Sequence, residues 1–188
     1  MSMCGFFGFV ADATEKIAEI DHDFHPAGLG VAVLTWLRAA LESPEGLLVL
    51  RRRVVALRVV NFDSTPTSAD LQAPVSGGST SADWYGLLSD IRDVPELILN
   101  AGFLEDGSDS PLHSFFTKWG YLVDLDTETF EVYRGSQLAP HTKGRFANRE
   151  PFNVFYWPVA LEVSWPLNAL PDSETFLAAT QSGSPGPG

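Results

Sequence analysis

The chain of 188 residues has few of the features that mark secreted, membrane or nucleic-acid-binding proteins. It holds a single cysteine, so no disulfide can form within it, and a disulfide-stabilised secreted scaffold is excluded. No stretch approaches the roughly 20 consecutive apolar residues that cross a bilayer, and the start lacks the basic and apolar regions of a signal peptide. We therefore expect a cytoplasmic protein without a membrane partner.

Basic residues are also scarce. The chain has 12 Lys and Arg against 24 Asp and Glu, which gives a formal net charge of -12. Proteins that bind nucleic acid need basic patches to neutralise phosphates, so we expect no nucleic-acid partner. The one basic run, 51–53, is typical of a solvated helix face, with an anion site as the alternative. The acidic balance favours solubility and suits a basic protein surface as partner.

What the sequence does have is enough apolar material for a core. Its hydrophobic fraction is 45%, with 13 Phe and 5 Trp. This length and composition predict a single α+β domain over residues 1–180. Residues 181–188 are rich in Gly, Ser and Pro, which predicts a flexible tail.

The hydrophobic pattern assigns the elements. Strands are predicted at 5–10, 16–20 and 159–165, and a β-hairpin with a loop of about three residues at 119–134. Helices are predicted at 31–41, 81–90 and 94–100, with an αL stop at Gly102 and a short C-terminal helix from 171. Residues 46–60 favour a helix, with a strand as the alternative. Strands pair with their sequence neighbours, so we expect a mainly antiparallel sheet layered with helices.

The clearest functional clue is the run Met3-Cys4-Gly5-Phe6-Phe7-Gly8. It resembles the start of the class II glutamine amidotransferases, in which the cysteine becomes N-terminal and attacks the glutamine amide. This resemblance implies an N-terminal-nucleophile αββα sandwich, with Cys4 as the nucleophile and a small amide as the substrate. The amine of Cys4 is free only if translation starts at Met3 or the preceding residues are trimmed.

Other residues complete this hypothesis. The resemblance assigns Asn100, together with backbone N–H groups, to the oxyanion hole, and catalysis would further involve Asp23. His25 and Arg145 are candidate substrate-binding residues. The alternatives are that Cys4 is a buried strand residue, and that the polar loops carrying the other residues face water.

The loop 21–30 carries a second resemblance, to a group of uncharacterised bacterial and phage proteins with an Asp-x-Tyr-Pro-x-Gly-Leu-Gly loop. His25 stands here where that group has Tyr, and 121–126 fits its Tyr-x-Val-x-Asp-Leu-Asp hairpin. The resemblance implies a shared fold and no activity. The N–H groups of 28–30 suggest an anion cradle or simply the start of a helix. No second cluster supplies further metal ligands, so we predict neither metal nor cofactor.

The leading hypothesis from the sequence is an amidohydrolase or amidotransferase that acts through Cys4. The first alternative is a non-catalytic acidic module that meets a basic protein surface. The second is a structural protein of bacterial or phage origin.

Overall fold

The computed structural model describes residues 3–72 and 84–181, and its mixture of helices and strands confirms the α+β class. The strands are β1 (Cys4–Ala11), β2 (Thr14–Ile20), β3 (Arg58–Val60), β4 (Phe103–Glu105), β5 (Thr117–Asp124), β6 (Thr129–Arg134) and β7 (Ala160–Pro166). The helices are α1 (Val31–Ala40), α2 (Gly46–Ala56), α3 (Trp84–Ile91), α4 (Pro95–Ala101) and α5 (Ser173–Gln181), with short turns η1 (Pro26–Gly30), η2 (Asp70–Gln72), η4 (Ser110–Leu112) and η5 (Leu167–Ala169). The predicted tail lies outside the described residues except for Gln181, which ends α5. None of these described helices is long and apolar enough to cross a membrane.

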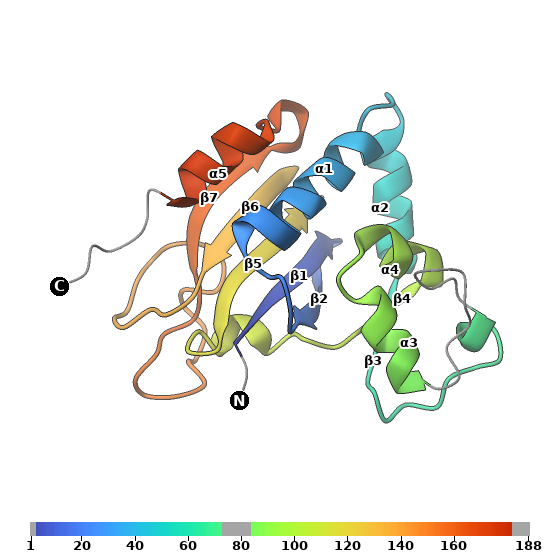
Figure 1. Ribbon diagram of the computed structural model, residues 1–188, viewed down its shortest axis with the longest axis horizontal. Helices are drawn as coiled ribbons and strands as arrows, with labels where there is room; N and C mark the ends of the chain where they lie inside the picture. Colours follow the sequence, from blue (N-terminus) through green and yellow to red (C-terminus); the bar gives the residue numbers. More distant parts are fainter. Residues whose placement is uncertain (1–2, 73–83, 182–188) are drawn as a thin grey trace.

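Five strands form the main sheet in the order β2-β1-β5-β6-β7 (Figure 1). Three of its four pairings are antiparallel, as predicted, while β1 and β5 run parallel. Parallel neighbours need a long crossover, and the helices α1 to α4 lie within it. The short strands β3 and β4 form a separate parallel pair. The αββα expectation is therefore corrected, because the described strands give one large sheet and a two-stranded ribbon rather than two stacked sheets.

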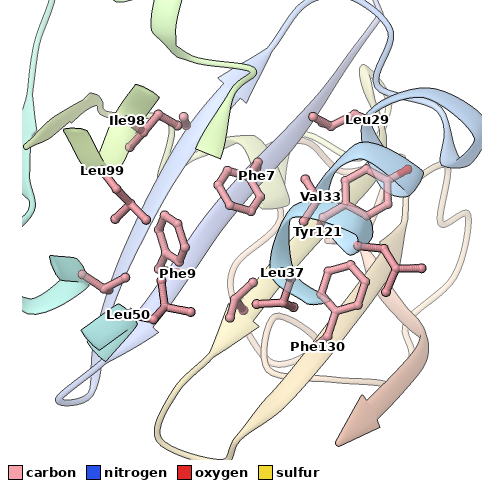
Figure 2. Packing of buried hydrophobic residues seen from close by; sticks show 14 of the residues in the cluster. Phe7, Phe9, Leu29, Val33, Leu37, Leu50, Ile98, Leu99, Tyr121 and Phe130 are labelled. Atoms are coloured by element: carbon pink, nitrogen blue, oxygen red, sulfur yellow. The ribbon is translucent and has the colours of Figure 1, made fainter. Parts of the chain in front are cut away.

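The two faces of the main sheet are covered differently. Side chains alternate along a strand, so Phe7 and Phe9 of β1 point to one face and Phe6 and Val10 to the other. The first face packs against α1, α2, α4 and α5 in one continuous apolar core. Figure 2 shows part of this core, with side chains of α1, α2 and α4 around Phe7 and Phe9. The second face is smaller and is covered by Phe146 and Val159, among other residues, from the connection between β6 and β7. An irregular connection thus takes the place that the second sheet of a sandwich would occupy.

The ambiguous segment 46–60 is a helix for most of its length and a strand at its end. Helix α2 stops at Ala56, where the buried amine of Lys16 donates to three carbonyl oxygens. These belong to Val54, Val55 and Leu57, at 2.8, 2.9 and 2.6 Å. The last carbonyls of a helix lack intrahelical donors, so the Lys16 amine caps α2 and fixes where β3 begins.

The predicted hairpin and the predicted end of a helix at Gly102 are both confirmed. The hairpin pairs Trp119 with Arg134 and Asp124 with Thr129, with four residues in its loop rather than about three. Helix α4 ends at Gly102, whose φ of 78° is the left-handed conformation that the sequence predicted.

Candidate functional site: an acidic cleft beside β2

Cys4 is a buried strand residue. Its backbone N–H donates to the Phe116 carbonyl at 3.1 Å, and its Sγ lies 3.5 Å from the Thr117 hydroxyl. Burial raises the pKa of the Cys4 thiol to about 11, with nearby Glu19 and Asp21 adding to the effect. Reactive cysteines are partly exposed and have a lowered pKa, so this environment favours a structural role.

Asn100 does not join Cys4. Its Oδ1 accepts a hydrogen bond from Arg53 at 2.7 Å at the end of α4, and Arg53 also pairs with Glu96. The polar neighbours of Cys4 among the described residues include Phe116, Thr117 and Glu19. The structure therefore does not assemble the predicted oxyanion hole from these residues.

Arg145 is also committed elsewhere. Its guanidinium donates to Asp124 and to both carboxylate oxygens of Glu131, at 3.1 and 3.0 Å for the latter. Despite burial, the Glu131 and Asp124 carboxylates raise the pKa of Arg145, so it is always charged. These carboxylates engage the Nε and Nη2 donors of Arg145, an arrangement that favours a structural role over the predicted substrate contact.

Asp23 and His25 shape the start of α1. The Asp23 backbone has a φ of 43°, and a Cβ added at Gly28 would lie 2.0 Å from the Asp23 Oδ1. The N–H groups of 28–30 all donate to the carbonyls of Asp23 or His25, so of the two alternatives the structure favours a helix start over an anion cradle. The exposed His25 ring lies against the Phe24 ring, 4.6 Å between centroids.

A cleft of about 350 Å³ lies instead between β2, the end of β4 and the segment that leads into η4. Among the described residues, four carboxylates line it, those of Glu19, Glu105, Asp106 and Asp109. One guanidinium, that of Arg92, lines it with them. The cleft therefore carries an excess of negative charge that matches the sign of the whole chain.

The wall of the cleft is held on the sheet by one backbone and one side-chain hydrogen bond. The Gly107 N–H donates to the Ile17 carbonyl at 2.8 Å, and the Ser110 hydroxyl donates to Glu19 at 2.8 Å. A Cβ at Gly107 would lie 2.4 Å from the Glu19 nitrogen, so only glycine allows this approach. The wall is thus fixed before any ligand arrives.

Glu105 is the least compensated of these acids. Among the described residues its carboxylate makes no hydrogen bond and no ion pair within 4.0 Å. Burial, opposed in part by Arg92, raises the pKa of Glu105, and the charges of Glu19 and Asp21 raise it further. Within 3–72 and 84–181, no three His, Cys, Asp or Glu side chains are arranged to hold a metal ion.

Arg92 is positioned by a chain of ionic contacts. Its Nη2 lies 2.8 Å from Asp21, which also binds the His22 Nδ1 at 2.8 Å, while the His22 Nε2 reaches Asp93 at 2.9 Å. The hydrogen bond from His22 lowers the pKa of Asp21, and that bond raises the pKa of His22. The Arg92 Nε and the His113 Nε2 line the same cleft buried and without a hydrogen-bond partner in the described part of the chain.

The cleft residues were missed in the sequence because they come from separate segments. The available signal was Glu105-Asp106-Gly107-Ser108-Asp109, three acids among turn-forming residues directly after a short apolar strand. Nothing local indicates that Glu19 and Arg92 join them, since that follows from β2 and α3 both lying against β4.

Comparison with known proteins adds no relative, because no family model, no curated protein and no solved structure matches the chain. The two resemblances drawn from short motifs therefore stay predictions.

Proposed function

We propose that the protein is a binding module whose acidic cleft receives a cationic side chain, lysine or arginine, from a basic protein partner. This is the first alternative from the sequence, now tied to named residues. The amidohydrolase hypothesis needs an accessible thiolate, and the burial and raised pKa of Cys4 do not favour it.

The observation that carries the proposal is the Glu105 carboxylate. A partly buried carboxylate without a partner is costly, because it loses hydration and gains no compensating contact. A cation in the cleft would supply that contact and relieve the repulsion from Glu19 and Asp21. The volume of about 350 Å³ suits one side chain or small group.

The proposal is tested with a double substitution in the cleft, Glu19→Gln with Glu105→Gln. Glutamine keeps the shape and removes the charge. The matched control is Glu42→Gln with Glu45→Gln in the exposed turn between α1 and α2, which changes the net charge by the same amount. The probe is the peptide acetyl-Lys-Lys-Ser-Gly-Lys-Lys-amide, titrated into ¹⁵N-labelled protein at fixed salt.

We expect the largest amide shifts at the cleft residues and a Kd at least about tenfold weaker in the cleft variant, with a change of less than about twofold in the control. Equal weakening in the two variants would mean that the peptide reads only the net charge. That result, or shifts located away from the cleft, would refute the proposal.

A further inference from the structure

Exposed apolar side chains stand next to the cleft. Monomeric proteins rarely expose large contiguous apolar patches, and the patches that they do expose often mark binding sites. We define the aromatic tip as Phe115, Phe152, Val154 and Phe155, which are 37%, 65%, 85% and 74% exposed. The tip belongs to the segment just after η4 and to the connection between β6 and β7.

The tip and the cleft are continuous. The ring of His113, which lines the cleft, contacts the Phe152 ring in a tilted arrangement with 3.7 Å between centroids. The Phe152 N–H also donates to the Leu112 carbonyl of η4 at 3.5 Å. A partner segment seated in the cleft would therefore meet aromatic surface directly beyond His113.

The tip is held in a fixed shape. The Asn153 Oδ1 accepts hydrogen bonds from the N–H groups of Phe155 and Tyr156, at 2.9 and 3.0 Å, and Tyr156 packs against Phe115 at 4.7 Å. This turn presents Val154 and Phe155 outward. A preformed apolar surface loses little conformational entropy when it binds.

We infer that the aromatic tip and the acidic cleft together form one docking surface for a basic protein segment in which apolar residues lie beside lysine or arginine. The inference rests on the proposed function of the cleft and specifies its partner. Charge decides among the occupants. A second copy of this chain, also at -12, would be repelled, and an anionic membrane would be repelled in the same way. A basic segment is attracted by the cleft and satisfies the apolar tip.

The test compares two peptides of equal charge. Acetyl-Lys-Lys-Leu-Phe-Lys-Lys-amide carries apolar residues, and acetyl-Lys-Lys-Ser-Gly-Lys-Lys-amide does not. The tip variant is Val154→Ser with Phe155→Ser. The matched control is Leu48→Ser with Val49→Ser, two half-exposed apolar residues on α2. Circular dichroism checks that each variant is folded, and all four sites are at the surface.

We expect the wild type and the control to bind the apolar peptide with a Kd about tenfold lower than that of the polar peptide. The tip variant should bind both peptides with equal Kd, and its Kd for the polar peptide should match that of the wild type. Loss of binding to both peptides in Glu19→Gln with Glu105→Gln, but not in the tip variant, separates the two sites. If the wild type shows no preference while the cleft variant still loses binding, the tip inference fails and the proposed function stands. If the cleft variant binds normally, the proposed function fails.

Two further outcomes would overturn the inference. One is that phosphatidylcholine vesicles bind the wild type but not the tip variant, which would make the tip a membrane contact. The other is that sedimentation shows a dimer that the tip substitutions convert to a monomer, which would make it a self-association surface.

Discussion

Two groups of charged side chains lie beside the same sheet and are built in opposite ways. Around Arg145, each carboxylate of Asp124 and Glu131 has a guanidinium within hydrogen-bond reach, and Glu15 pairs with Arg149 at 2.6 Å. In the cleft, as far as the described ranges 3–72 and 84–181 show, four carboxylates face one guanidinium, and Arg92 is itself bound to Asp21. The first group is internally satisfied, whereas the second is not.

The difference separates a structural network from a site that awaits a ligand. Paired, buried charges hold the connection between β6 and β7 onto the sheet, where the apolar cluster is small. Unpaired charges do not stabilise the fold until a cation binds. Residues that lower the stability of the free protein are typical of binding sites. Substitutions in the two groups should therefore change stability in opposite directions.

The largest effect is expected for Arg145→Met. It leaves Asp124, whose side chain is 3% exposed, and Glu131 without their cation. Breaking a buried pair from one side costs about 3 kcal/mol, which would lower the Tm by roughly 6–12 °C in a domain of this size. Differential scanning calorimetry at pH 7 measures it.

The control for this substitution is Arg52→Met, which removes an exposed arginine of α2. It should change stability by less than about 0.5 kcal/mol. A loss below about 1 kcal/mol for Arg145→Met would show that the network around Arg145 is not what holds the connection in place.

A smaller effect is expected for Asp124→Asn, and it depends on pH. Burial alone would raise the pKa of Asp124, but hydrogen bonds from Thr127, Arg145 and Asp126 outweigh it and the net pKa is lowered. A lowered pKa in the folded state gives stability that is present above the unfolded pKa and lost as pH falls through the folded pKa. The variant should be about 1–2 kcal/mol less stable at pH 7, a hydrogen-bonded charge being lost. In urea unfolding the gap from wild type should narrow below pH 4, and a constant gap down to pH 2 would contradict the assignment.

The opposite sign is expected for Glu105→Gln. The folded pKa of Glu105 is raised by burial, so its charge destabilises the fold once pH exceeds the unfolded pKa. Removing the charge should raise stability at pH 7 by on the order of 0.5 kcal/mol, with no gain below about pH 4 where the acid is protonated in both states. Glu42→Gln is the control and should leave the Tm unchanged. A lower Tm for Glu105→Gln would mean that this carboxylate has a stabilising partner, and the main support for the cleft as a binding site would be lost.

Local signals account for most of the fold. The alternation at 121–125, the Gly102 stop and the helical spacing at 31–41 each depend on neighbouring residues, and each was predicted correctly. The parallel pairing of β1 with β5 was not, because it joins strands more than a hundred residues apart and has no local signature. The end of α2 was also not predictable from local signals, because it depends on Lys16 of the distant strand β2.

The candidate site was harder to predict than the fold. Motif reading selects residues with reactive groups, such as Cys4 and His25, yet whether a group is reactive depends on its burial and on its partners. Arg145 shows this, since the same positive side chain is a substrate anchor if free and a structural cation once Glu131 and Asp124 surround it. To identify the cleft, one must know which carboxylates lack partners, and this follows only from the folded structure.

The smallest effect concerns Cys4, and it separates the cleft from a nucleophilic site. The thiol is linked to the cleft through one residue, because Thr117 contacts the Cys4 Sγ and donates to the carbonyl of Ser110, which lines the cleft. If the cleft only binds, Cys4→Ala should change the Kd for the polar lysine peptide by less than about twofold. With a pKa of about 11, the native thiol should also react with iodoacetamide at pH 7.5 far more slowly than the urea-unfolded protein does. Labelling of the native protein at the same rate as the unfolded protein would show that the thiolate is accessible. That result would favour the hypothesis that Cys4 is a nucleophile.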